Sequence, residues 1–538
     1  MFNRKRFTLS LTLGILTAAV LIGIIALFLI LLLIEGGSDL TAPNKKIWRI
    51  LGFTAFQAGL STLLSLAIGI TLAWALSHKS LFFGRSVLIA LLSVAMVLPT
   101  LVAVLGLVTV WGRRGWFNEV LSTLDLTSGT WIYGLGGILL AHSYLNAPFM
   151  ARSLLQRLEG IPAEQRKLSQ SLGLTPWQRF RFVEWAAIKG SLPALCSTVF
   201  LLCFTSFAIV LTLGGSSKYN TLEVAIYEAI KLDFDLPHAV ILALMQLAVC
   251  ALLVSVASTF RLSSNAIDQR RFNLVWKEPR LTAFAQGLII VLFAAFFLAP
   301  LVAILTDGIN ADLLSLFSSS LFLKTSFNSL ALATASAFLT ISLAMLLVKA
   351  RVNTLAPLRL KQSKSSLALR QVLSFSGSVY LAVPSLVMAF GFFLLARSLF
   401  SSIYLVAPFA LVIANALLAL PFALAVLGPA IEKVTVKDDR LAFSLGLSGW
   451  SRWRLLEWPL IKPELTFVAA LSFCFSLGDF GIIALFGTQD FATLPWLLYQ
   501  KMGSYRTDEA AAIALVLLTI TLLVFLAVPQ MRKGNPHA

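Results

Sequence analysis

Long runs of apolar residues without a charged side chain are the feature that most limits how this chain can fold. The first runs from Phe7 to Ile34, between Arg6 and Glu35. It is too long for the core of a signal peptide, and as a helix it can cross about 30 Å of hydrocarbon. Similar runs lie near 50–78, 87–112, 131–151, 190–214, 239–260, 282–306, 326–348, 371–396, 402–427, 465–487 and 510–530. The pattern predicts twelve membrane-spanning helices.

The composition supports an all-α polytopic membrane protein. Of the 538 residues, 58% are hydrophobic and 12% are charged, about half the charged share of soluble domains. A soluble globule could not bury so much apolar surface, and a disordered, fibrous or disulfide-stapled chain is also excluded. The four cysteines all lie inside apolar runs, which indicates packing roles and neither disulfides nor metal ligands. They are Cys196, Cys203, Cys250 and Cys474.

The positive charge is distributed unevenly between the predicted loops. The net charge is +18, with 42 Lys and Arg against 24 Asp and Glu. If both termini are cytoplasmic, 31 of the 42 basic residues face the cytoplasm and 11 face the other side. This is the positive-inside bias of membrane proteins. It predicts cytoplasmic termini and a lipid bilayer as the partner of the apolar surface, with no role for nucleic acid.

The sequence contains an internal repeat. Residues 167–193 and 440–466 are identical at 13 of 27 positions with an offset of 273. A second pair, 93–106 and 378–391, aligns Pro99 with Pro384 at an offset of 285. Six predicted spans in each half give both halves the same orientation, so the pseudo-two-fold axis lies along the membrane normal, as in many transporters. We therefore divide the chain into a first half (1–265), a cytoplasmic linker (266–281) and a second half (282–538).

Both copies of the long repeat fall in predicted cytoplasmic loops. Each begins with a polar helical segment that ends in a glycine. Nine residues follow the glycine, and then an apolar-Glu-Trp segment begins. The glycine permits a sharp turn between two short helices. An ordinary basic loop beside the membrane could explain one copy. Two copies in the same topological position favour a shared function.

These loops resemble the EAA loop of ABC-importer permeases, which reads Glu-Ala-Ala, three residues, Gly, nine residues and Ile-x-Leu-Pro. The resemblance implies transmembrane cores at about 55–260 and 326–528, with coupling loops at 159–190 and 432–463. In this family the loop docks on an ATPase subunit, so two ATPase copies are expected as partners. The coupling residues implied are Lys167, Leu168, Ser171, Gly173, Leu174, Glu184, Arg440, Leu441, Ser444, Gly446, Leu447, Glu457 and Pro459. The chain departs from the pattern because Lys-Leu-Ser and Arg-Leu-Ala replace Glu-Ala-Ala.

Further segments resemble the thiamine and thiamine pyrophosphate branch of these permeases. They are 112–116, 137–149, 159–173, 179–185 and 477–511. The resemblance implies import of thiamine and its phosphates across a bacterial inner membrane, from a periplasmic thiamine-binding protein. That protein is expected to meet the outer loops, such as 215–237 and 488–509.

Two alternative functions remain at this stage. Fused ferric-iron permeases share the layout of two six-span halves, and an ion-coupled secondary transporter also has twelve spans. A secondary transporter requires an ion-coupling site, for which one intramembrane acid is thin support. An intramembrane enzyme is disfavoured because the chain lacks any paired catalytic motif.

The sequence contains no GxxxxGK[ST] phosphate loop, so ATP and Mg²⁺ are expected on partner subunits and no cofactor on this chain. The four histidines are scattered, and no metal site is expected. They are His78, His142, His238 and His537. For His142, beside Asn146, an interhelical hydrogen bond is favoured over a substrate contact.

Asp479 is the one acid inside a predicted span, and intramembrane carboxylates are costly enough to suggest function. It could contact the cationic ring of thiamine, with aromatic faces contributing cation–π attraction. Alternatively, it could form an internal ion pair or a hydrogen bond between packed helices. For the phenylalanines, plain packing remains the alternative. The predicted pathway is asymmetric and comprises Asp479, Phe480, Phe475, Phe207 and Ser206.

Overall fold

The computed structural model describes residues 2–37, 44–79, 81–123, 131–259, 278–354, 364–399, 403–447 and 449–533. Within these ranges the regular structure is helical, without strands. The all-α prediction is therefore confirmed for the described part of the chain. The predicted linker 266–281 lies outside it except for its last four residues.

The first half contains these helices in chain order: α1 (Phe2–Gly36), α2 (Lys45–His78), α3 (Arg85–Val94), α4 (Thr100–Trp111), α5 (Trp116–Thr123), α6 (Leu135–Glu159), α7 (Ala163–Ser171), α8 (Pro176–Arg179), η2 (Phe180–Glu184), α9 (Trp185–Ile188), η3 (Lys189–Ser191), α10 (Leu192–Phe204), α11 (Ala208–Leu213), η4 (Ser217–Tyr219), α12 (Leu222–Lys231) and α13 (Leu236–Thr259).

The second half contains α14 (Arg280–Asn310), α15 (Leu313–Ser318), α16 (Ser320–Asn353), α17 (Lys364–Ser378), η5 (Val379–Ala382), α18 (Ser385–Leu399), α19 (Ile403–Ser444), α20 (Gly449–Arg452), η6 (Trp453–Glu457), α21 (Trp458–Leu477), α22 (Gly481–Phe486), α23 (Leu494–Gly503) and α24 (Thr507–Lys533).

Fewer uninterrupted spans are present than the twelve predicted. In the described residues, nine helices are long and apolar enough to cross a membrane, or ten if the bent α17–α18 pair counts as one span. That pair bends by 101° just before Pro384, and α3 and α4 are likewise separated ahead of Pro99. Proline removes a backbone donor and disfavours helix in the residue before it, so both repeats break at the same place.

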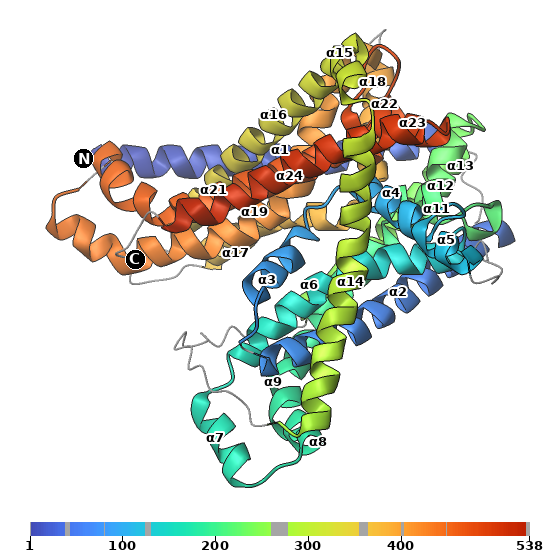
Figure 1. Ribbon diagram of the computed structural model, residues 1–538. Coiled ribbons are helices and arrows are strands. Elements are labelled where there is room, and N and C mark those ends of the chain that lie inside the picture. Colours follow the sequence, from blue (N-terminus) through green and yellow to red (C-terminus); the bar gives the residue numbers. More distant parts are fainter. Residues whose placement is uncertain are drawn as a thin grey trace.

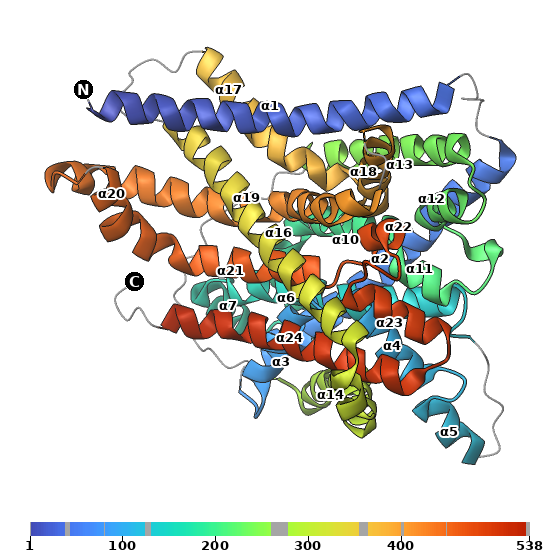
Figure 2. The ribbon, with the colours of Figure 1, turned by 90° about the horizontal axis from the view of Figure 1, so that it is seen from above.

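The two halves exchange their first helices. The N-terminal α1 packs against α16, α17 and α18 of the second half, while α14 packs against α2 and α4 of the first half. Figure 2 shows α1 lying along α17 and α18, with α13 as its neighbour from its own half. The first helix of each half thus packs against the other half.

The helices form two diverging arms (Figure 1). One arm, with α19, α21 and α24, runs to the left of the view, and the other, with α2, α6 and α9, runs to the bottom. The arms meet near α4, α11, α22 and α23. The two repeated loops therefore lie at the far ends of separate arms, and the broken helices lie where the arms meet.

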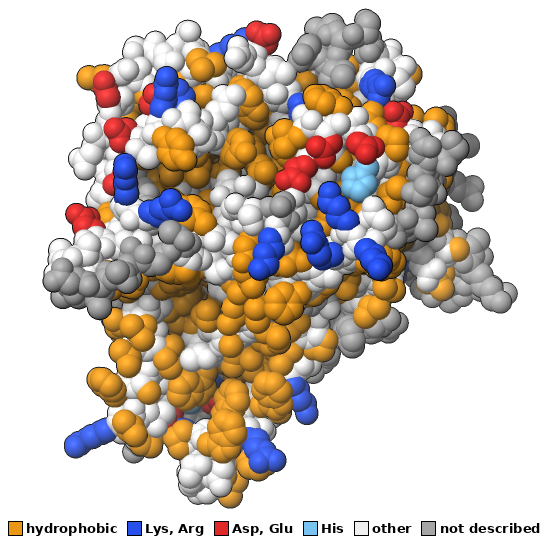
Figure 3. Space-filling model, turned by 90° about the vertical axis from the view of Figure 1, so that its right-hand side faces the viewer, with side chains coloured by type: hydrophobic (Ala, Val, Ile, Leu, Met, Phe, Trp, Pro, Cys, Tyr) orange, Lys and Arg blue, Asp and Glu red, His pale blue; other side chains and the backbone are white. Residues whose placement is uncertain are grey.

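Much of the surface is apolar. Exposed side chains include Phe338 (75% exposed), Phe327 (72%) and Val291 (64%). Figure 3 shows a broad apolar area over the lower part of one face, with acidic side chains gathered near its top. An apolar surface of this extent needs a partner, and lipid provides one.

Candidate functional site: the repeated loops and the central breaks

The two repeated loops share one backbone form. Gly173 and Gly446 have φ of 62° and 64°, the left-handed region that favours glycine. Beyond each glycine a backbone hydrogen bond closes the helix end, from Leu174 N–H to the Ser169 carbonyl (3.2 Å) and from Leu447 N–H to the Ala442 carbonyl (2.9 Å). This is the helix-ending arrangement that such a glycine permits.

The agreement continues beyond the glycines. The short helix α8 is followed by the π-helical turn η2, and α20 is followed by the π-helical turn η6. All four elements stand at the repeat offset of 273. A π turn is rare and is often found at functional sites, so its recurrence in both copies marks a shared geometry.

The tips of the loops expose large apolar side chains. In the first loop Leu168 is 59% and Trp177 is 69% exposed, and in the second Leu441 is 47% and Trp450 is 70% exposed. Lys167 and Pro459 are also exposed, whereas the Arg440 side chain lies outside the described residues. The two exposed apolar pairs occupy equivalent positions and offer matching surfaces to a partner.

Other predicted coupling residues hold the loop together internally. Ser171 and Ser444 donate to the carbonyls of Leu168 and Leu441, each at 2.9 Å. Glu184 is buried and accepts from His78 Nε2 at 2.6 Å, whereas the half-buried Glu457 accepts from Arg452 Nε at 2.9 Å. These side chains shape the loops from inside.

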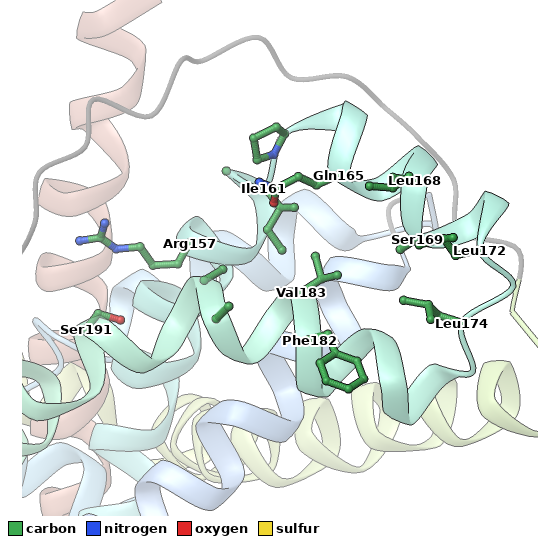
Figure 4. A pocket seen from close by; sticks show the side chains of 15 residues that line it. Arg157, Ile161, Gln165, Leu168, Ser169, Leu172, Leu174, Phe182, Val183 and Ser191 are labelled. Atoms are coloured by element: carbon green, nitrogen blue, oxygen red, sulfur yellow. The ribbon is translucent and has the colours of Figure 1, made fainter.

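A hollow of about 710 Å³ lies inside the first loop. Figure 4 shows side chains from α7 and the turn after it, among them Leu168 and Leu174, facing Phe182 and Val183 of η2 across it. Its lining is largely apolar, with leucine, isoleucine, valine and phenylalanine side chains on its walls. The hollow brings together two of the predicted coupling residues.

Two repeat-related ion pairs support the loops, and the sequence reasoning missed them. Arg85 donates to Glu159 at 2.7 Å, and Arg370 approaches Glu432 at 3.4 Å. The arginines stand at the offset of 285 and the glutamates at 273. Extending the repeat alignment to charged residues could have found both pairs.

At the meeting point of the arms, α10–α11 and α21–α22 are broken at equivalent positions, around Phe207 and Asp479. The Asp479 carboxylate accepts the backbone N–H of Ile482 at 3.2 Å. It therefore caps α22, where the positive end of the helix favours a negative charge. Ser206 lies at the corresponding break of the first half.

Four aromatic rings meet between these breaks. Phe207 stacks on Phe480, with ring centroids 5.6 Å apart. Phe207 also contacts Tyr227 at 5.3 Å, and Phe480 contacts Tyr499 at 4.9 Å. Each half contributes one phenylalanine and one tyrosine. The predicted Phe475 instead packs edge-on against Phe422 at 5.3 Å, outside this aromatic cluster.

A second buried carboxylate, Glu223 of α12, was missed because the sequence reasoning placed residues 215–237 in an outer loop. It is fully buried and accepts from Gln246 Nε2 at 2.9 Å. It also accepts the backbone N–H of Leu386 and interacts electrostatically with Asp479. Two carboxylates thus lie near the aromatic cluster, both at the N-termini of second-half helices.

The interhelical hydrogen bond expected of His142 is present. Its Nδ1 lies 2.9 Å from Ser61 Oγ on α2, and the neighbouring Asn146 donates to Cys203 Sγ of α10 at 3.4 Å. Across the described ranges, no three His, Cys, Asp or Glu side chains are grouped so that they could hold a metal ion.

Comparisons with known proteins agree with this geometry. Residues 356–530 match the family described as binding-protein-dependent transport system inner membrane component. The thiamine transport system permease protein ThiP of Escherichia coli K12 is 38% identical over 495 residues, which cover 91% of this chain and 90% of that protein. ThiP of Haemophilus influenzae Rd is 37% identical over 497 residues, covering 91% and 90%. ThiP of Brucella abortus 2308 is 36% identical over 506 residues, covering 94% and 91%.

Proposed function

This chain belongs to the family of binding-protein-dependent transport system inner membrane components and is a multi-pass inner-membrane permease, and we propose that its substrates are thiamine and thiamine phosphates. The observation that carries the proposal is a pair of loops with one backbone form, in a chain that matches thiamine permeases over nine tenths of its length. Transport is driven by partner subunits that bind ATP and Mg²⁺, and no catalytic role is assigned to this chain.

In the proposed topology, twelve segments cross the membrane and both termini are cytoplasmic. The repeat supports this count because it pairs α3–α4 with α17–α18 and α6 with the first part of α19. Residues 1–265 and 282–538 form the two permease halves. Orientation rests on the 31 of 42 basic residues that this topology places in the cytoplasm.

Two identical ATPase subunits dock on the two loops, 159–190 and 432–463. The exposed leucine and tryptophan of each loop offer equivalent apolar contacts, and aromatic anchors of this kind dominate many interfaces. A periplasmic thiamine-binding protein delivers substrate at the opposite end. The separated arms and the stacked aromatic cluster fit an inward-open state, which closure of the ATPase pair converts to an outward-open one.

Substrate passes between the halves at the central breaks. Asp479 and Glu223 place two carboxyl groups there, and Phe207, Phe480 and the two tyrosines supply ring faces for a cation. Ser206 lies beside this path. Backbone N–H groups at the N-termini of α22 and α18 donate to the two carboxyl groups.

Reconstitution tests the proposal. The permease, purified with its ATPase subunits, is placed in liposomes with the cognate periplasmic protein outside and ATP inside. Uptake of radiolabelled thiamine that needs both ATP and the periplasmic protein is expected. Uptake driven by an ion gradient without ATP indicates a secondary transporter, and uptake of ferric iron in place of thiamine indicates an iron permease; either result contradicts the proposal.

A further inference from the structure

Four ionisable side chains form a buried junction in the first half. Arg179 donates to both oxygens of Glu278, at 2.6 and 2.7 Å. His78 bridges the two acids, with Nδ1 2.7 Å from Glu278 and Nε2 2.6 Å from Glu184. The four side chains are 2 to 7% exposed. We call this cluster the ionic junction.

The ionic junction brings charges of opposite sign together. Both ring nitrogens of His78 face carboxylate oxygens, which only accept hydrogen bonds when ionised, so the ring carries both protons and a positive charge. The buried Arg166 of α7 adds a further positive charge that interacts with Glu184. Removing one partner from such a buried set leaves a charge without its neighbour, so the junction resists being pulled apart.

The ionic junction joins both halves of the permease. His78 ends α2, Arg179 ends α8 and Glu184 ends η2, all in the first half, whereas Glu278 lies two residues before α14 of the second half. Figure 1 shows the lower end of α14 beside α8 and α9. Since α14 also packs along α24, it runs from the first loop into the body of the second half.

The second loop has no buried ionic junction of this kind among the described residues. The helices α2 and α16 have equal length and stand at an offset of 275, so Asn353 occupies the position of His78, and it donates to Ser10 of α1. Glu457 pairs with Arg452, both about one quarter exposed, and it also interacts electrostatically with Lys349 of α16.

We propose that the ionic junction is a mechanical link. Its members are positioning residues that make the first loop, α2 and α14 move as one body. ATPase motion at the first loop is thereby carried directly to the second half. This inference rests on the proposed function as an ATP-driven permease.

The transport measured per ATP tests the link. In proteoliposomes, Glu278→Gln is expected to lower thiamine uptake per ATP hydrolysed about tenfold, within the range of typical coupling effects, with the ATPase subunit still bound. The matched control is Glu35→Gln, which breaks the more exposed ion pair with Arg397, away from both loops, and is expected to change the ratio less than about twofold. An unchanged ratio in Glu278→Gln, or an equal loss in both variants, overturns the proposal.

Arginine at position 78 supplies a rescue variant. His78→Arg keeps a forked positive donor between the two acids. It is expected to retain coupling, whereas His78→Gln is expected to lose it as Glu278→Gln does. If both variants behave alike, the charge of the junction has no role in coupling, and the proposal fails.

A distance measurement separates this proposal from the choice of substrate. Spin labels replace two exposed residues, Arg181 on η2 and Leu281 on α14, in a background without the native cysteines. Their distance is expected to stay constant between the nucleotide-free and vanadate-trapped complexes, and to broaden in Glu278→Gln. If this distance changes between the two states while the ionic junction is intact, the proposed link is overturned. If the complex transports no thiamine, the proposed substrate fails while this distance still decides on the junction.

Discussion

The ring of Phe207 in the first half lies nearly parallel to the ring of Phe480 in the second, with an angle of 15° between their planes. Both rings are 4% exposed, and they stand at equivalent positions in the repeat. The contact therefore lies on the boundary between the halves, beside two broken helices. The two rings must therefore move apart if the two halves separate at this depth in the membrane.

The first prediction concerns this aromatic cluster as an outer gate. Phe480→Ala removes the stacked ring and its contact with Tyr499, and the loss of such a buried ring costs about 3–5 kcal/mol. The reporter is a cysteine introduced by Ser206→Cys in a background without other cysteines. We expect it to react at least about fivefold faster with a membrane-impermeant thiol reagent from the periplasmic side when Phe480→Ala is also present than when the Phe480 ring is kept. Phe475→Ala serves as the control because its ring packs elsewhere. Equal rates with and without the Phe480 ring would exclude a gate at this position.

The second prediction separates the charge of Asp479 from its cap. Asp479→Asn keeps an oxygen that accepts the Ile482 N–H, and Asn and Asp are comparable helix caps. Thiamine uptake is expected to fall about tenfold, since one charge-assisted contact is worth about 1.5–3 kcal/mol, while the complex assembles normally. Asp479→Ala removes both properties. If uptake by Asp479→Asn equals that of the unmodified permease, the carboxylate contributes only structure.

The third prediction concerns the glycine turns of the two loops. Gly173→Ala and Gly446→Ala meet open space, so the methyl group itself clashes with nothing. The strain arises from φ near +60° and costs about 1–2 kcal/mol at each site. We expect the double variant to retain clearly less ATPase subunit through affinity purification. Gly190→Ala, also in open space but without a positive φ, is the control, and equal retention in both would show that the turn is dispensable.

The sequence predicted the elements that depend on local pattern and repetition. Helical class, the glycine turns and the central position of Asp479 follow from apolar runs and from two aligned copies. Fewer than twelve uninterrupted spans are found in the described residues because Pro99 and Pro384 interrupt helices that hydropathy reads as continuous, and the count of twelve stays a prediction. Glu223 could not be assigned, since its burial depends on the folding of α12 against α13 and α18.

The same reasoning explains why the bonding of the coupling loops was not predictable. Glu184 and Glu457 are identical in the repeat, yet one is buried against His78 and the other pairs with Arg452. The difference comes from residues outside the aligned segment, chiefly Glu278, which is distant in sequence. An alignment of the two copies cannot reveal a contact that exists in one of them.

The last prediction follows from the protonation of Glu278. Burial alone would raise its pKa, but hydrogen bonds from His78 and Arg179 and the charges of both lower the pKa below its ordinary value. A carboxyl with a lowered pKa stabilises the folded state above the pKa of the unfolded chain, about 4.3, and this stability is lost as the pH falls through the lowered value. The difference in melting temperature between the unmodified permease and Glu278→Gln in detergent should therefore be full at pH 6 and shrink below about pH 4. A difference that shrinks already between pH 6 and 5 would show that the pKa of Glu278 is raised, and would contradict a persistent ionic junction in that range.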